Sequence, residues 1–295
     1  HTLITDAGRV ELHLPANAKS ATLQTGAKVR AKGWLFNDGQ KDGNSTDLVL
    51  NDELESLMQL ADDGGSTTTA TAAASSTATL PNTLGEQRTL VILVNFQDNA
   101  AQPWTIAQTQ ELVFGNVNDY YLEASHGKTW LTGDVLGYYT LPIDATCSIN
   151  AIDNYGRQAV EDSGIDVDSY DRWVYIYPEN TACGWTGQGT VGGSPSRSFI
   201  NGAFTANTIG HELGHNFGLH HAKDLDCSDG VQSGRCLSFE YGDTLDIMGK
   251  QGVNGHFNAF SKQQLGWITP AAGEIVTADS DGTYQLEPYE SAPAG

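Results

Sequence analysis

The residues best suited to chemistry in this chain lie between positions 211 and 221, where the sequence reads H-E-x-x-H-x-x-G-x-x-H. Positions four apart lie on the same face of an α-helix, so the imidazoles of His211 and His215 can converge on one metal ion. Glu212 would border the same cleft and could accept and return a proton. The spacing therefore predicts a helix that carries two metal ligands and a general base.

A third ligand requires the chain to turn back after this helix. Gly218 can adopt the left-handed conformation that ends a helix, which would return His221 to the metal. The motif spacing selects His221 and leaves His220 outside the coordination sphere. Imidazoles also bind iron, copper and nickel, but three histidines with an adjacent glutamate and an open position are typical of catalytic zinc. We expect a zinc site with water in the fourth position.

One of only two methionines in the chain, Met248, follows this motif within the segment 245–249. Its placement resembles the Met-turn of metzincin proteases, in which a tight turn puts a methionine beneath the metal-binding histidines. Gly249 gives the chain freedom to turn there. The alternative is an ordinary core methionine.

Among metzincin-like families, the chain most closely resembles the gametolysin-type peptidases, with the immune inhibitor A type of bacterial secreted metalloprotease as a near neighbour. The resemblance covers roughly residues 88 to 290. It departs at Lys250, where some metzincins have a tyrosine that helps to stabilise the transition state. It is carried by a strand-like segment at 88–96, a helix-like segment at 118–127 that leads to Gly133-Asp134-Val135, and a closing helix at 257–268.

This resemblance implies an α+β fold, with a twisted mixed sheet that precedes the zinc helix, and an endopeptidase that hydrolyses extracellular proteins. Glu212 would activate a zinc-bound water. The family also places a substrate-binding edge strand in the Gly-rich segment 184–193, with Gly189, Thr190, Val191 and Gly192 as candidate contacts. A plain surface loop is the alternative for that segment.

The charge balance limits the partners. Fifteen basic residues against 36 acidic ones give a formal net charge of -21. Such a surface repels nucleic acid and anionic membranes, so protein or peptide substrates are the expected partners. The Asp-rich segments 224–226 and 279–281 could supply oxygen ligands to structural Ca²⁺, although most acidic clusters are simply solvated.

The cysteines indicate an oxidising compartment. Cys227 and Cys236 bracket a short loop and are expected to form one disulfide, which leaves Cys147 to pair with Cys183. Such bridges favour a secreted, extracellular protein over a cytosolic one with free thiols. The sequence contains no apolar run long enough to span a bilayer. The chain begins at His1 without a methionine, as expected after removal of a signal peptide.

Composition divides the chain into parts. Residues 1–60 alternate apolar and polar positions and predict a small β domain; residues 61–86 read as a flexible Ser/Thr/Ala linker; residues 87–295 would form the catalytic domain. Within this domain the apolar periodicity predicts helices near 106–124 and 150–163, before the zinc helix at about 205–218. Alternation at 282–287 suggests the start of a truncated C-terminal β unit. The first domain could be an inhibitory propeptide of a zymogen, released by cleavage in the linker, or an accessory module.

Two other functions remain open at this point. A metzincin fold could have lost activity and serve as a binding or adhesion protein, although the intact Glu212 counts against this. The same histidines could also hold redox-active iron or copper. Digestion of casein or gelatin tests the first alternative, and elemental analysis tests the second.

Overall fold

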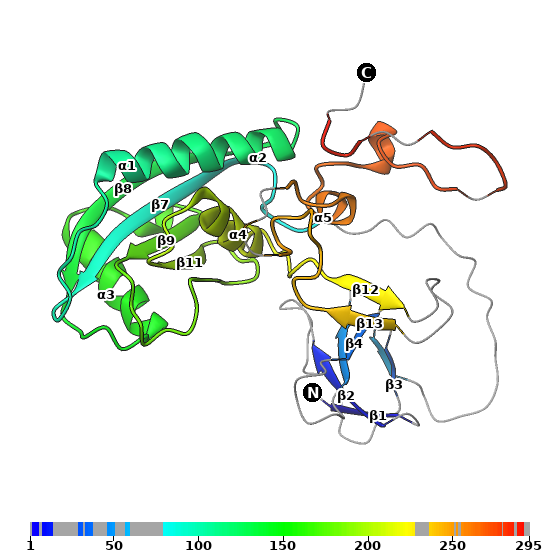
Figure 1. Ribbon diagram of the computed structural model, residues 1–295, viewed down its shortest axis with the longest axis horizontal. Helices are drawn as coiled ribbons and strands as arrows, with labels where there is room; N and C mark the ends of the chain where they lie inside the picture. Colours follow the sequence, from blue (N-terminus) through cyan, green and yellow to red (C-terminus); the bar gives the residue numbers. More distant parts are fainter. Residues whose placement is uncertain are drawn as a thin grey trace. The chain divides into compact units, whose positions relative to one another are not determined.

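The computed structural model describes residues 79–227, 236–250, 252, 255–278, 280–285 and 288–291, together with the backbone of six strands nearer the N-terminus. The chain divides into two compact units. One contains residues 1–78 and 226–238, and the other contains residues 79–225 and 239–295. The histidine motif belongs to the second unit (Figure 1).

The first unit contains only strands among its described residues. Four of them form a sheet in the order β1-β2-β5-β4, and β3 pairs with β6. The strands are β1 (Thr2–Thr5), β2 (Gly8–His13), β3 (Val29–Ala31), β4 (Gly33–Asn37), β5 (Thr46–Leu50) and β6 (Leu57–Gln59). Strands were expected from the alternating pattern of this region, while its status as a propeptide or accessory domain stays a prediction. Residues 61–78 of the expected linker lie outside the described residues.

The second unit is built on a five-stranded mixed sheet in the order β10-β11-β9-β7-β8. Strand β7 runs parallel to β8 and β9, β9 runs parallel to β11, and β10 is antiparallel to β11 at the edge. The fold is therefore α+β with a mixed sheet, as expected. The strands are β7 (Gly85–Phe96), β8 (Thr129–Leu141), β9 (Arg172–Tyr177), β10 (Gly187–Gly189) and β11 (Ser196–Asn201).

Helices cover both faces of this sheet. The first helical stretch runs without a break through α1, a π-helical segment η2 and α2, and the expected helix at 106–124 is thus confirmed. The helix expected at 150–163 is also confirmed, as α3. The helical elements are α1 (Ile106–Gln110), η2 (Glu111–Val117), α2 (Asn118–Ala124), α3 (Ile149–Asp162), η3 (Val167–Ser169), α4 (Ala206–Asn216), α5 (Ala259–Gln264) and η4 (Pro270–Ala272).

The central strand β7 explains how the two layers are held together. Successive side chains of a strand point to opposite faces, and here both faces are covered. Val91 and Leu93 pack in the cluster that includes α2 and α4 residues. Leu90 and Ile92 pack in a second cluster with residues of α3. The near-continuous apolar run at the start of the catalytic unit is therefore a strand buried on both sides.

The chain just before β7 differs from the sequence expectation. The linker was predicted to extend to residue 86, but Gly85 and Glu86 already belong to β7. Thr83 is buried, and its hydroxyl donates to the carbonyl oxygen of Leu265 at 2.8 Å. The indole of Trp267 donates to the carbonyl oxygen of Thr83 at 3.1 Å. Polar composition suggested a linker here because these long-range partners cannot be read from local sequence.

The C-terminal strand expected at 282–287 is also not observed where the structure describes it. Residues 282–285 lie in no strand, and residues 286 and 287 are outside the described set. Alternation alone does not make a strand, since the backbone groups need a neighbouring strand to pair with.

The short hairpin of β12 (Asp224–Cys227) and β13 (Cys236–Phe239) carries one of the two disulfides. Cys227 bonds to Cys236, and Cys147 bonds to Cys183, which is the pairing expected from the sequence. No described helix is both long and apolar enough to cross a membrane.

Candidate metal centre

Helix α4 carries the first half of the motif between two well-defined ends. At its start, the Thr205 hydroxyl accepts a hydrogen bond from the Thr208 N–H at 3.1 Å, which caps the helix. At its end, Gly218 has a φ of 103°, and its N–H donates to the His215 carbonyl oxygen at 2.8 Å. Leu219 N–H donates to the Gly214 carbonyl oxygen at 3.1 Å, which completes a Schellman ending. This ending reverses the chain.

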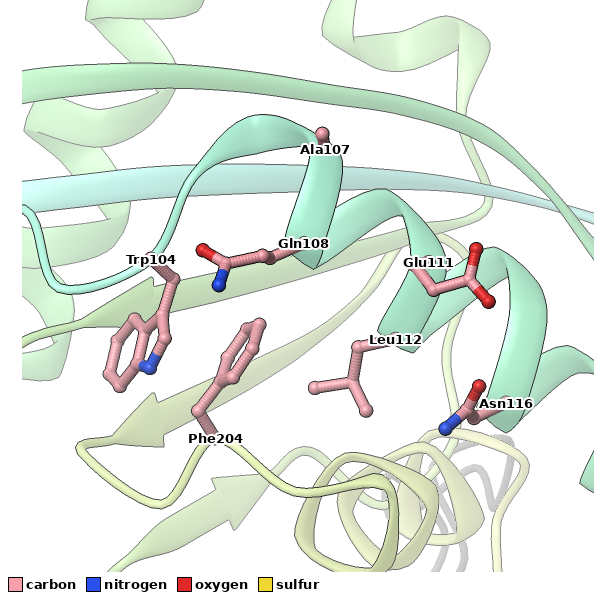
Figure 2. Close-up of a pocket in the computed structure, with 7 residues that line it drawn as sticks. All are labelled: Trp104, Ala107, Gln108, Glu111, Leu112, Asn116 and Phe204. Atoms are coloured by element: carbon pink, nitrogen blue, oxygen red, sulfur yellow. The ribbon is translucent and has the colours of Figure 1, made fainter.

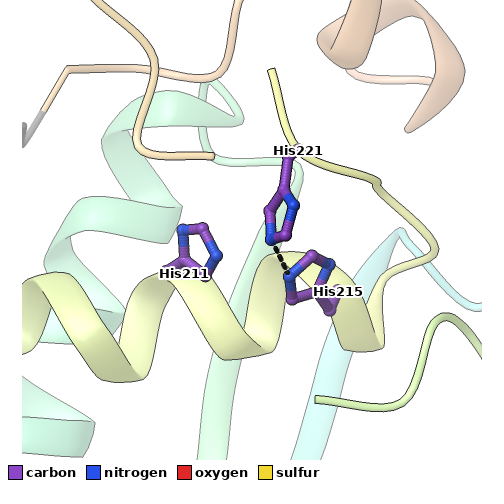
Figure 3. Close-up of side chains that lie close together, drawn as sticks. All are labelled: His211, His215 and His221. Atoms are coloured by element: carbon purple, nitrogen blue, oxygen red, sulfur yellow. Dashed lines mark hydrogen bonds between the residues drawn. The ribbon is translucent and has the colours of Figure 1, made fainter. Parts of the chain in front are cut away.

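The reversal brings the three motif histidines together. One ring nitrogen from each of His211, His215 and His221 lies within 4.8 Å of the other two. Figure 3 shows His211 and His215 on the same side of α4, with His221 approaching from the chain that follows the helix. The Nε2 atoms of His215 and His221 are 3.0 Å apart. His220 is exposed and does not belong to this group.

Each of these imidazoles is held through its Nδ1 atom. The Nδ1 of His211 lies 2.8 Å from the Ile247 carbonyl oxygen, and that of His215 lies 2.8 Å from the Leu219 carbonyl oxygen. A carbonyl oxygen only accepts, so both Nδ1 atoms carry the proton and both Nε2 atoms present a lone pair. Here the Nε2 lone pairs face a common point.

The third imidazole is oriented by a side chain instead. The Nδ1 of His221 lies 2.6 Å from Oε1 of Glu240, whose other oxygen pairs with Lys223 at 2.6 Å. Although burial raises the pKa of Glu240, hydrogen bonds from Lys223 and His221 bring it below its ordinary value. The carboxylate is therefore charged and can hold the Nδ1 proton of His221.

The electrostatics of this cluster suit a cation. Burial lowers the pKa of all three imidazoles, that of His215 to about 4. They are thus neutral at neutral pH, as metal ligands must be. Three neutral imidazoles with oriented Nδ1 protons and converging Nε2 lone pairs fit a transition-metal ion well.

Glu212 lies beside the cluster and is almost completely buried. Burial raises the pKa of its carboxyl group to about 8. Among the described residues, its Oε2 atom has no hydrogen-bond partner. A buried carboxyl group with an unused oxygen and a pKa not far from neutral is suited to exchange a proton with a molecule that enters the site.

Strand β10 passes directly over Glu212. A Cβ atom added to Gly187 would lie 2.3 Å from Oε1 of Glu212, and one added to Gly189 would lie 2.7 Å from the Glu212 carbonyl oxygen. At Gly189 a side chain would meet the backbone of α4, so glycine is required there, whereas at Gly187 a side chain would displace the carboxyl group of Glu212. This is a packing reason for the glycines, in addition to the one suggested by the resemblance.

The backbone of β10 also has an open side. Asn201 N–H donates to the Thr186 carbonyl oxygen, and Thr190 N–H donates to the Arg197 carbonyl oxygen, both at 2.9 Å. Antiparallel pairing alternates, so the backbone N–H and C=O groups of Gly187 and Gly189 point away from β11. Among the described strands, none pairs with β10 on that side, so these groups lie at the edge of the sheet beside His215.

The four residues predicted to contact substrate divide between strand and turn. Gly189 ends β10, and the other three follow it outside the strand. Val191 is exposed, and the Thr190 hydroxyl accepts from the Arg197 N–H at 3.0 Å. Gly192 N–H donates to the His215 carbonyl oxygen at 2.8 Å. This turn therefore joins the edge strand to the C-terminal end of α4.

Met248 supports α4 from within the core. It is fully buried, and a Cβ atom on Gly214 would lie 2.4 Å from its sulfur. Gly214 stands between the two helix histidines, so the methionine packs beneath them. The turn that presents it is held by buried Asp246, whose carboxylate accepts from the N–H groups of Met248 and Asn258 at 2.7 Å each.

Sequence reasoning missed several residues that shape this centre. Arg172 is fully buried, and its guanidinium donates to the Asn216 carbonyl oxygen at the end of α4 at 2.8 Å. The Asn216 side chain amide in turn donates to Thr190 and Arg197 carbonyl oxygens at 3.0 and 2.9 Å. No local motif marks these residues, because their partners are distant in sequence.

Tyr241 and Glu240 were missed for the same reason. The Tyr241 ring lies 3.8 Å from the His221 ring, centroid to centroid. Burial, and to a lesser degree the charges of Glu240 and Glu212, raises the pKa of the Tyr241 phenol. Both residues reach the centre only because the chain folds back after β13.

Other surface features lie away from this cluster. A shallow pocket next to α1 and η2 is lined by Trp104, Leu112 and Phe204, and none of the three histidines lines it (Figure 2). The Trp104 and Phe204 rings stack there at 4.6 Å. Among the described residues, the three histidines form the single group suited to a metal, and the expected calcium segment at 224–226 contributes to none. Asp279 of the second calcium segment lies outside the described residues.

Comparisons with known proteins end in a family assignment. The search of curated proteins gives no match. A crystal structure of metalloproteinase-II from Bacteroides fragilis shares 16% identity over 65% of this chain and 54% of that one, with a TM-score of 0.39. The structure of a chaperone–substrate complex shares 20% identity over 61% of this chain and 34% of that one, also with a TM-score of 0.39. The chain thus spans about a third to a half of these proteins. The model of the gametolysin peptidase M11 family matches residues 105–287, most of the second unit and the whole histidine motif, and the chain belongs to that family.

Proposed function

We propose that this protein is a secreted zinc-dependent endopeptidase that hydrolyses peptide bonds of extracellular proteins. One observation carries the proposal. In a member of a peptidase family, three imidazoles with engaged Nδ1 atoms direct Nε2 lone pairs at one point, beside a buried carboxyl group. His211, His215 and His221 would hold the metal, and Glu212 would move protons.

Zinc bound by these histidines would supply Lewis acidity, which makes a water more acidic and draws electron density from a carbonyl oxygen. Glu212 accepts a proton from the attacking water while the water oxygen bonds to the scissile carbonyl carbon. When the carbon–nitrogen bond breaks, Glu212 returns that proton to the leaving amine. Its burial and raised pKa, about 8, suit a group that both accepts and donates near neutral pH.

The free edge of β10 supports the assignment of a peptide substrate. An extended peptide can pair with the outward-facing backbone groups of Gly187 and Gly189 and so be laid across the centre. Backbone groups are common to all peptides, so this pairing can bind an internal segment of a protein chain whatever its sequence. It therefore favours an endopeptidase. Thr190, Val191 and Gly192, next along, would contact adjoining parts of the substrate.

Met248 would act as the methionine of a Met-turn, because it packs against Gly214 beneath the two helix histidines. Gly218 would serve to end the helix and return His221.

Two disulfides and a formal net charge of -21 support a secreted location. The N-terminal unit would be a propeptide or an accessory module. Comparing activity on a short peptide before and after cleavage in the 61–86 segment separates these two roles.

The test measures protein hydrolysis by the purified chain with zinc bound, after zinc is removed, and after zinc is added back. Casein or gelatin should be cleaved, a zinc chelator should stop the cleavage, and readdition of zinc should restore it. Elemental analysis should find one zinc per chain. Stoichiometric zinc without cleavage of any protein would favour the binding or adhesion role, and bound iron or copper would favour redox chemistry. Mapping new N-termini in a digested protein mixture would then define cleavage preference.

A further inference from the structure

Tyr241 lies against the imidazole cluster, next to His221. Its ring centroid is 3.8 Å from that of His221 and 6.2 Å from that of His211, with interplanar angles of 34° and 22°. The side chain therefore borders two of the three imidazoles proposed to hold the metal.

Ordinary packing does not account for this position. The side chain is 44% exposed, so burial of apolar surface holds it only weakly. Its backbone has a φ of 59°, the left-handed region that favours glycine and asparagine and is uncommon for a bulky aromatic residue. Such a conformation is strained and is found preferentially at functional sites. The observations point to a role for the side chain itself.

The phenol of Tyr241 differs from the neighbouring Glu240 in its hydrogen-bonding role. The charged carboxylate of Glu240 can only accept hydrogen bonds, whereas a phenol with an ordinary pKa near 10 keeps its proton at neutral pH and donates one. Attack of water on a peptide carbonyl places negative charge on the carbonyl oxygen, and a fixed donor beside that oxygen stabilises the transition state. The half-exposed ring leaves this donor open to an entering substrate.

We propose that Tyr241 is a catalytic residue whose hydroxyl donates a hydrogen bond to the carbonyl oxygen of the scissile peptide as negative charge develops on it. This role rests on the proposed peptidase function. The hydrogen bond would strengthen in the transition state, so its loss should lower kcat far more than it raises KM.

The experiment compares Tyr241→Phe with Tyr155→Phe in the full chain. Tyr155 lies on α3 and is also 44% exposed, so it controls for the loss of an exposed hydroxyl. Tyr241→Phe should lower kcat by about 10²- to 10³-fold with KM nearly unchanged. Affinity for a phosphinic peptide, which mimics the tetrahedral state, should fall by a similar factor. Tyr155→Phe should change none of these quantities.

Two further measurements separate donation from a structural role. Zinc affinity of the metal-free protein and its melting temperature should be the same for the wild type and Tyr241→Phe. Tyr241→p-aminophenylalanine, which keeps an N–H donor on the ring, should recover part of the lost rate. Loss of zinc affinity in Tyr241→Phe would instead assign the residue to holding His221 and overturn the proposal.

The result also distinguishes this inference from the broader one. A wild-type protein that cleaves peptides, together with a Tyr241→Phe variant whose kcat stays within threefold, would overturn the role of Tyr241 and leave the peptidase standing. A zinc-loaded wild type that neither cleaves peptides nor binds the phosphinic peptide would overturn both.

Discussion

The two sides of the imidazole cluster are built in different ways. On the α4 side, His211 and His215 stand on a buried helix, and main-chain carbonyl groups hold their Nδ1 atoms. On the other side, His221 is held by Glu240, a side chain that is 49% exposed and paired with Lys223. Two imidazoles are thus fixed by the backbone, while the third depends on an ion pair at the surface.

Several buried contacts hold the helix side in place. Met248 packs against Gly214, and Arg172 binds the carbonyl oxygen of Asn216 at the helix end. Moving α4 would disturb the core and leave polar groups without partners, which costs several kcal/mol. The Glu240 side lacks this support, so small changes in charge there should tune metal binding without unfolding the protein.

The largest effect should come from removing any one imidazole. His211→Ala, His215→Ala and His221→Ala should each weaken zinc binding and abolish hydrolysis, because three ligands are needed to leave one open position. His220→Ala is the matched control, since it adjoins the third histidine outside the cluster. Zinc content by elemental analysis is the measurement. Full zinc in His221→Ala with loss from His220→Ala would mean that the third ligand is misassigned.

Glu212→Gln should separate chemistry from metal binding on the helix side. Hydrolysis should fall by about 10²- to 10⁴-fold, because the amide cannot accept the proton of the attacking water. Zinc content should stay at one per chain, because Glu212 lies beside the ligands without being one of them. A variant that keeps more than about a tenth of the wild-type rate would contradict the general-base role.

Asp246 holds the turn that carries Met248 beneath α4. Its contribution can be tested through the pH dependence of stability. Burial raises its pKa to about 6, from 3.8, despite two backbone hydrogen bonds. A raised acid pKa means that the protonated form favours folding, so this contribution is present at low pH and is lost as pH rises through about 4 to 6.

Asp246→Asn removes this titration. Relative to the variant, the wild type should lose about 2 kcal/mol of unfolding free energy between pH 4 and pH 7, since each pKa unit corresponds to about 1.4 kcal/mol and part of the loss occurs below pH 4. Chemical denaturation of both proteins at several pH values measures the difference. A difference that does not change with pH would show that the carboxyl group is ionised without penalty.

Glu240→Gln tests the weaker side of the cluster directly. The amide can still accept from Nδ1 of His221 but carries no charge, so zinc affinity should fall by about 10- to 100-fold while the fold stays intact. Competition with a zinc chelator gives the affinity, and the melting temperature of the metal-free protein is the control. Equal affinities would mean that the backbone, and not Glu240, orients the third imidazole.

The smallest effect should come from Lys223→Met. This lysine pairs with Glu240 at 2.6 Å, but both side chains are partly exposed, and such pairs contribute about 1 kcal/mol or less. Zinc affinity should drop by less than about fivefold, and the difference from the wild type should shrink at high salt. A loss as large as that of Glu240→Gln would show that the ion pair acts as one unit.

Local geometry explains what could be predicted from the sequence. The spacing of His211 and His215 places them on one helix face, and Gly218 permits the turn that brings His221 back, so all the relevant contacts lie within eleven residues. The apolar run that became β7 and the helices at 106–124 and 150–163 were predictable because their patterns are periodic. The cysteine count and the short Cys227–Cys236 loop similarly restricted the disulfides.

Only the tertiary structure showed what orients and completes the centre. Glu240 and Tyr241 contact His221 from the chain that follows the β12–β13 hairpin, and Arg172 contacts the end of α4 from strand β9. Residues 79–86 looked like a linker until the partners of Thr83 were known. These contacts depend on where distant segments of the chain meet. The residue types along one segment do not predict which other segment it will contact. Helix spacing is decided by the backbone within a few residues, whereas the partners of a buried or stacked side chain are decided by the packing of the whole unit.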